Sequence, residues 1–130
     1  GLKIDLLMEE KLVLVSSGPN PGPVGGADYV YVDWGPDFAL HHARTFPDAS
    51  NPGLSVALGP LALGYILANG GSGYFRKRVV QTYLESGRLH LVPGMPQFSY
   101  PIYAVHSTGL DEALLSAALA GLHAVSEGEA

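Results

Sequence analysis

The sequence predicts an α/β fold with a largely parallel sheet. Two patterns alternate along its 130 residues. Short runs of β-branched and aromatic residues are typical of strands, and longer runs with apolar residues three and four positions apart are typical of helices. Clusters of glycine and proline separate the runs. A chain of this length can bury one core, so we expect a single domain, and no internal repeat is visible.

The first strand is expected at Leu6–Ser16, because the second half of this segment is apolar and β-branched. Prolines and glycines in Ser17–Gly26 end the strand and predict a surface loop. Tyr29–Asp33 alternates aromatic residues with valines and predicts a second strand. Pro36 is then well placed in the first turn of a helix that runs to Phe46.

A short strand is expected at Leu54–Leu58. The helix predicted at Leu61–Leu67 is apolar almost all round, so we expect it to be buried. Gly70–Gly73 should end that helix and form a glycine loop between two helices, with Tyr74 and Phe75 carried on the loop.

An amphipathic helix follows this loop and should end at Gly87, and Arg88–Val92 is expected to form a strand. Ser99–His106 has the pattern of a strand buried on both faces, although Pro101 indicates an edge position or a bulge. Leu110–Val125 carries apolar residues at helical spacing and predicts an amphipathic terminal helix.

The charge and composition exclude several classes of function. Twelve acidic and seven basic residues give a net charge of −5, which opposes attraction to a phosphate backbone. We therefore expect no appreciable affinity of this chain for duplex DNA, and Arg76–Arg78 is interpreted as a solvated helix start. No apolar run approaches the roughly 18 residues of a membrane span. Gly1–Asp5 does not resemble an export signal, so we expect a soluble cytoplasmic protein.

The residues with catalytic or metal-binding chemistry form no recognisable constellation. Cysteine is absent, and the five histidines lack the spacing of a zinc-binding helix. Ser72 is not in a nucleophile elbow, and its glycine-rich surroundings lack the ending of a phosphate-binding loop. The acidic pairs Glu9–Glu10 and Asp111–Glu112 lie on faces that we expect to be exposed. The sequence therefore predicts no metal, no cofactor and no enzymatic activity.

Two segments have features suited to binding a ligand. One ends a strand just before a helix, and the other is the glycine loop with its aromatic residues. In α/β sheets, ligands lie beyond the carboxyl ends of strands, where helix N-termini offer free amides. The candidate ligand-binding residues are Asp33, Trp34, Gly35, Gly71, Ser72, Gly73, Tyr74 and Phe75. The alternative is that the aromatic residues belong to the core and the glycines only supply positive φ angles.

Four pieces of the sequence, in this order, resemble LysR-type transcription regulators. They are Leu-Leu-Met-Glu-Glu-Lys-Leu-Val-Leu-Val-Ser-Ser from Leu6, Tyr-Val-Tyr-Val-Asp-Trp-Gly from Tyr29, Gly-Gly-Ser-Gly-Tyr-Phe from Gly70 and Phe-Ser-Tyr-Pro-Ile-Tyr-Ala-Val from Phe98. Together with the Ala/Leu-rich terminal helix, they resemble the later part of the effector-binding region of that family. The resemblance covers residues 5–125.

The resemblance implies a periplasmic-binding-protein-like (type 2) lobe with hinge strands, with the first lobe largely absent. Residues 6–16 and 99–106 look like the hinge strands, about 27–92 like the second lobe, and 110–125 like the helix that returns to the first lobe. Two features depart from the family. Arg76 stands where relatives tend to have proline, and Ser17–Gly26 is richer in proline and glycine than its usual counterpart.

By this resemblance, the chain senses a small-molecule effector, for which loop amides would suit an anionic or polar compound. DNA would be bound only through an N-terminal helix-turn-helix that this chain lacks, and self-association is expected because the hinge strands and the terminal helix would expose apolar surface. Two alternatives stay open. One is a fragment of a solute-binding protein of similar fold, and the other is a small α/β enzyme.

Overall fold

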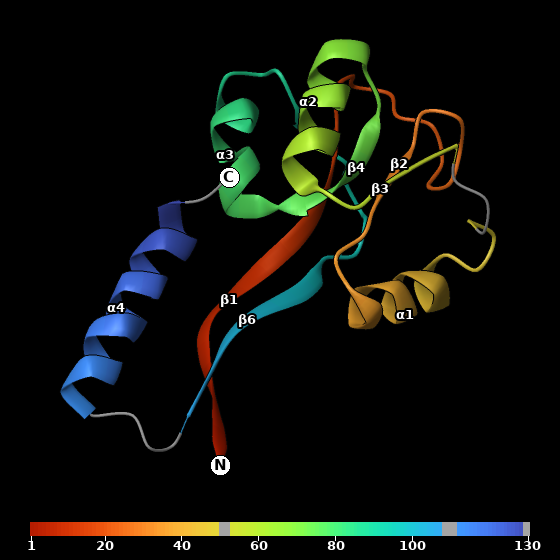
Figure 1. Cartoon of the computed structure of the whole chain (residues 1–130). Helices are drawn as coiled ribbons and strands as arrows, with labels where there is room; N and C mark the ends of the chain where they lie inside the picture. Colours follow the sequence, from red (N-terminus) through yellow and green to blue (C-terminus); the bar gives the residue numbers. More distant parts are fainter. Residues whose placement is uncertain (50–52, 108–111, 129–130) are drawn as a thin grey trace.

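The computed structural model describes residues 1–49, 53–107 and 112–128, which form ten helices and strands (Figure 1). In chain order these elements are β1 (Leu2–Ser16), β2 (Val30–Val32), α1 (Pro36–Thr45), β3 (Leu54–Val56), α2 (Gly59–Asn69), β4 (Ser72–Arg76), α3 (Lys77–Glu85), β5 (His90–Leu91), β6 (Phe98–Ser107) and α4 (Glu112–Gly128). The alternation of strands and helices confirms the predicted α/β class.

The long strand β1 connects two parts of the molecule because it changes partners along its length. Leu12–Ser16 pairs with β4, and Leu2–Leu12 pairs with β6. All pairings of β1, including the short one with β5, are antiparallel. Leu2–Leu12 of β1 and the whole of β6 form a two-stranded ribbon that extends beyond the end of β4 (Figure 1).

Three of the strands that precede helices, β2, β3 and β4, run parallel. β2 and β3 form a parallel pair, and a parallel bridge between Tyr29 and Ser72 links the β2 segment to β4. The expectation of a largely parallel sheet is therefore wrong for the pairings of β1, which are all antiparallel, and correct for the pairings among β2, β3 and β4. The sequence did not show this difference, because strand direction depends on which segments meet in space.

Helices cover both faces of the sheet. Alternate residues of a strand point to opposite faces, so Val13 and Val15 pack on one side with α2 and α3, and Leu12 and Leu14 pack on the other side with α1. The first cluster is aliphatic apart from Phe75. The second consists mainly of aromatic side chains from the β2 segment, α1, β4 and β6. The molecule thus has a helix–sheet–helix arrangement.

Two expectations about the middle of the chain are wrong. The segment predicted to be a glycine loop between two helices is the strand β4, and all five of its residues are buried. Helix α2 is not buried all round, because Leu61 and Tyr65 are exposed and only one of its sides contacts the sheet. The apolar sequence of these segments predicted burial correctly for β4 and overestimated it for α2.

Strand β6 confirms the interpretation of Pro101. Among the described residues β6 pairs only with β1, so it is an edge strand, and β1 has a bulge at Leu7 close to the residue opposite Pro101. The expectation that this strand is buried on both faces is wrong, because Tyr103 and Val105 are exposed.

The terminal helix α4 confirms the predicted amphipathic helix, although Leu110 and Asp111 lie outside the described residues. It lies beside the first half of β1 in Figure 1 and contacts that strand. Within the described ranges, no helix has the length and apolar character needed to cross a membrane.

Candidate functional site

Three helices begin at one edge of the sheet. Asp33–Gly35 leads from β2 to α1, two residues lead from β3 to α2, and α3 follows β4 directly. Because these strands run parallel, their carboxyl ends and the helix N-termini that follow lie at the same edge, here called the carboxyl edge. The ribbon of β1 and β6 passes this edge.

None of these three helices has a side-chain cap. Gly35, Leu58 and Arg76 occupy the N-cap positions, and none of them accepts a hydrogen bond from its helix through its side chain. The first amides of a helix have no partner within the helix, and they carry the positive end of its dipole. The carboxyl edge therefore gathers the kind of donors that bind anions and polar groups.

Trp34 fixes the geometry of this edge. Its Nε1 donates a hydrogen bond to the carbonyl oxygen of Tyr74 at 2.9 Å, and its ring meets that of Tyr100 edge-on with centroids 5.2 Å apart. A Cβ atom at Gly59 would lie 2.8 Å from the Trp34 ring, so α2 begins in direct contact with the indole. Trp34 thus connects β4, β6 and the start of α2.

Asp33 and Gly35 form the turn that starts α1. The Asp33 carboxylate accepts a hydrogen bond from the Gly35 amide at 2.9 Å, and Asp33 itself is exposed. Gly35 has a φ of 99°, a conformation that favours glycine. The turn holds Trp34 inward and leaves the Asp33 side chain in solvent.

A buried ion pair closes the same edge. Arg76 Nη2 lies 2.8 Å from Glu10 Oε1, and Arg78 Nε lies 3.4 Å from the same oxygen. Glu10 is only 4% exposed, so the expectation that Glu9–Glu10 lies on an exposed face is wrong for Glu10. Arg76 is buried too, whereas Lys77 and Arg78 are exposed, as expected for a solvated helix start.

Gly71 and Ser72 lie at the opposite end of β4 from Trp34. The Gly71 amide donates to Ser17 Oγ at 2.9 Å, and the Ser72 amide donates to the carbonyl oxygen of Asp28 at 2.9 Å. A small cleft of about 120 Å³ lies here, lined by Ser72, Gly71 and the loop that follows β1. The five residues of β4 span about 13 Å between this cleft and the carboxyl edge.

The other three candidates divide between the two faces of the sheet. Phe75 points toward α2, as would a Cβ atom at Gly73, whereas Tyr74 points toward α1 and donates a hydrogen bond from its hydroxyl to the carbonyl oxygen of Pro96 at 2.9 Å. The eight candidate residues therefore do not share one wall. The structure brings Asp33, Trp34 and Gly35 together with the backbone of Tyr74.

The sequence interpretation missed a buried histidine. His42 is 4% exposed and lies in the aromatic cluster on the α1 side of the sheet. The adjacent His41 is exposed, so the two histidines lie on different sides of α1. The aromatic residues four positions before and four positions after His42, Phe38 and Phe46, were the signal that this helix face is buried.

Comparison with known proteins defines the class of this fold. No protein-family model matches the sequence, and no curated protein matches it. Solved structures that match include LysR-type transcription regulators and their regulatory domains, and this chain has the periplasmic-binding-protein-like fold of those domains. The predicted fold class is thereby confirmed.

Individual structures show how much of such a protein the chain represents. The bromide-bound regulatory domain of HypT from Salmonella typhimurium has a TM-score of 0.73 at 13% identity over 95% of this chain and 66% of that domain. DarR from Vibrio fischeri in complex with DNA has a TM-score of 0.65 at 11% identity, covering 99% of this chain and 46% of DarR. ArgP from Mycobacterium tuberculosis has a TM-score of 0.64 at 17% identity, covering 98% and 48%. The chain thus spans less than half of DarR and of ArgP.

Proposed function

We propose that this chain is the effector-sensing part of a LysR-type transcription regulator and that it holds a small polar or anionic effector at the carboxyl edge. The observation that carries the proposal is the meeting of three uncapped helix N-termini at that edge, in the fold of LysR-type regulatory domains. Ligands of α/β sheets lie at such edges. The exposed side chains of Lys77 and Arg78 add positive charge there.

Asp33, Trp34 and Gly35 form the wall of the proposed site, with the indole as its apolar part. Tyr74 supports this wall through its carbonyl oxygen, and Phe75 supports it from the core. Gly71, Ser72 and Gly73 would act at a distance, by fixing where β4 begins. An anionic effector is favoured because a regulatory domain of this fold, that of HypT, has been solved with a bromide ion bound.

The remaining functions of such a regulator would lie outside this chain. DNA would be bound by a helix-turn-helix domain. We propose that the regulator is cytoplasmic and acts as an oligomer. DarR, which has the same fold over nearly the whole of this chain, has been solved in complex with DNA. We propose a binding role and no catalysis, because the carboxyl edge offers amides, cations and an aromatic wall, which recognise a ligand without reacting with it.

The test is a titration of the chain with sodium bromide, sodium acetate or sodium benzoate at constant ionic strength. The unfolding temperature is measured at each anion concentration. At least one anion should raise this temperature in a saturable manner, since a ligand that binds only the folded state stabilises it. Arg78→Gln should weaken that anion's effect several-fold.

The matched control is Arg88→Gln. It removes the same charge beyond the other end of α3, where the Arg88 guanidinium lies 5.4 Å from the centre of the Tyr83 ring. The proposed site would be contradicted if Arg78→Gln and Arg88→Gln weakened the anion's effect on the unfolding temperature equally. It would also be contradicted if none of the three anions had a saturable effect.

A further inference from the structure

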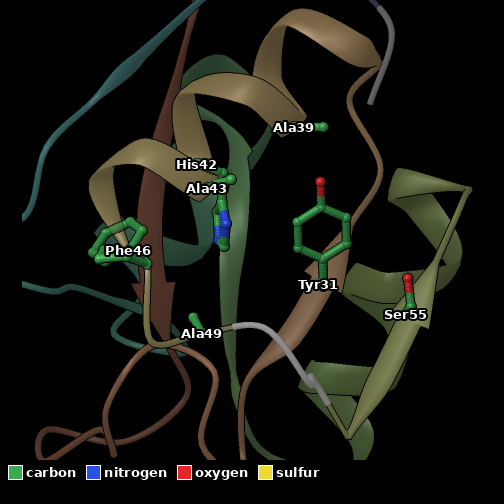
Figure 2. A pocket seen from close by; sticks show the side chains of 8 residues that line it. Tyr31, Ala39, His42, Ala43, Phe46, Ala49 and Ser55 are labelled. Carbon is green, nitrogen blue, oxygen red and sulfur yellow. The ribbon is translucent and has the colours of Figure 1, made fainter.

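A second cavity lies between α1 and the β2–β3 pair, on the sheet face that α1 covers. Its volume is about 330 Å³, within the range of small-molecule sites. Figure 2 shows the His42 ring projecting from α1 into the space between Tyr31 and Phe46. The described residues that line it are Tyr31, Ala39, His42, Ala43, Phe46, Pro47, Ala49 and Ser55. None of these residues belongs to the carboxyl edge.

His42 forms the polar part of this cavity. The Tyr29 hydroxyl lies 2.8 Å from His42 Nε2, and Tyr29 is 2% exposed. Burial holds the pKa of Tyr29 above its usual range, so the phenol keeps its proton at neutral pH. This bond is the only one that the Tyr29 hydroxyl makes with the described residues. The buried proton is therefore satisfied only if Tyr29 donates it to Nε2.

This assignment fixes the other ring nitrogen of His42. A neutral imidazole that accepts at Nε2 carries its proton on Nδ1. Desolvation lowers the pKa of His42, which favours this neutral form. Nδ1 makes no hydrogen bond with any residue that the structure describes. The histidine, which lines the cavity, therefore has one N–H donor that no described residue uses.

The other lining residues define the shape and polarity of the ligand. The His42 ring lies edge-on to Tyr31 with centroids 5.0 Å apart, and its centroid is 5.2 Å from that of Phe46. The three alanines leave room for a flat molecule beside these rings. Among the described residues, the lining contains no acidic or basic side chain, so it offers no counter-ion to a charged ligand.

We propose that this cavity binds an uncharged one-ring aromatic molecule with a carbonyl-type acceptor, which receives the hydrogen bond of His42 Nδ1. The aromatic part packs against Tyr31 and Phe46, and the acceptor faces the imidazole. This site is separate from the carboxyl edge and does not depend on the function proposed for that edge.

The experiment compares two one-ring probes, acetophenone and ethylbenzene, of which only the first has an acceptor, by chemical-shift titration of the isotope-labelled chain. Acetophenone should bind saturably with a Kd on the order of 1 mM, as is reasonable for nine heavy atoms. Its shifts should centre on the residues of α1 and β3 that line the cavity. Ethylbenzene should bind about fivefold more weakly, because it lacks the acceptor.

Two helix variants locate the site. Ala43→Leu fills the cavity and should weaken acetophenone binding at least tenfold, whereas Ala68→Leu makes the same change at an exposed position of α2 and should leave the Kd unchanged. The bromide and carboxylate titrations should be the same in both variants. Equal affinity for the two probes, no saturation by about 10 mM, or an unchanged Kd in Ala43→Leu would overturn the proposal.

Discussion

At the scale of single residues, Glu10 and His42 are buried polar side chains, and each meets a partner from another part of the chain. Glu10 lies on β1 two positions before Leu12, which pairs with Arg76 at the end of β4, and the two charged side chains meet there. A buried charge needs such a partner because desolvation of an isolated charge costs several kcal/mol. Nothing local in the sequence identifies this pair, since its members are 66 positions apart.

We expect His42 to make the stability of the chain depend on pH. Desolvation lowers its pKa in the folded state below the ordinary value of 6.5, so between these two pKa values the unfolded chain binds more protons. The stabilising contribution is therefore present above about pH 6.5 and is lost as the pH falls through the folded-state pKa. Urea unfolding between about pH 7.5 and pH 5 measures this loss.

The comparison uses two histidine variants. In His42→Phe the decrease in unfolding free energy on acidification should be smaller than in the wild type, while His90→Gln changes an exposed histidine of β5 and should retain the wild-type decrease. An unchanged decrease in His42→Phe would show that the buried imidazole does not control this part of the pH profile.

At the scale of elements, the start of β4 is held by backbone constraints. The amide of Gly71 donates to Ser17 Oγ, and the amide of Ser17 donates to the carbonyl oxygen of Gly71, both at 2.9 Å. Gly71 has a φ of 139°, and a Cβ there would lie 2.7 Å from the carbonyl oxygen of Asp28. Only glycine fits this junction, which sets the register of β4 against β1.

We therefore expect Gly71→Ala to lower the free energy of unfolding by about 1–3 kcal/mol, through backbone strain and the close contact with Asp28. Gly64→Ala is the matched control, because Gly64 lies inside α2 with no atom within 4 Å of the added methyl group. There the substitution should stabilise by about 0.5–1 kcal/mol, since alanine favours helix. Chemical denaturation measures both, and effects of the same sign would refute this account of Gly71.

At the scale of the whole molecule, the ribbon of β1 and β6 exposes one apolar face. Ile4 is opposite Val105 and Leu6 is opposite Tyr103 in the register, so these four side chains lie on the same face as Leu2. All five are more than half exposed. An apolar face of this kind on a ribbon with open strand edges favours association with another apolar surface.

The chain should consequently self-associate at concentrations of tens of micromolar, as measured by sedimentation velocity. Ile4→Lys combined with Val105→Lys should shift the population toward monomer, because two charges would have to be buried in the contact. Leu61→Lys, at an exposed position of α2 away from the ribbon, should leave the distribution unchanged. A wild-type monomer over this whole range would refute the prediction.

The sequence by itself determined the local elements of this protein. Period-two alternation located β2, helical spacing located α1 and α3, and the position of Pro36 fixed where α1 begins. These features depend on neighbours within a few residues, which the sequence states directly. The resemblance carried by four short pieces also identified the fold, which the solved structures confirm.

Tertiary structure alone decided strand direction, burial and the composition of the candidate sites. Residues 71–75 have the glycines and aromatics of a loop, but pairing with β1 makes residues 72–76 a strand whose side chains alternate between two faces. This alternation separates Ser72 from Phe75, and the length of the strand separates Ser72 from Trp34. Contacts such as those of Glu10 with Arg76 and of Tyr29 with His42 join distant segments, and they exist only once the sheet has formed.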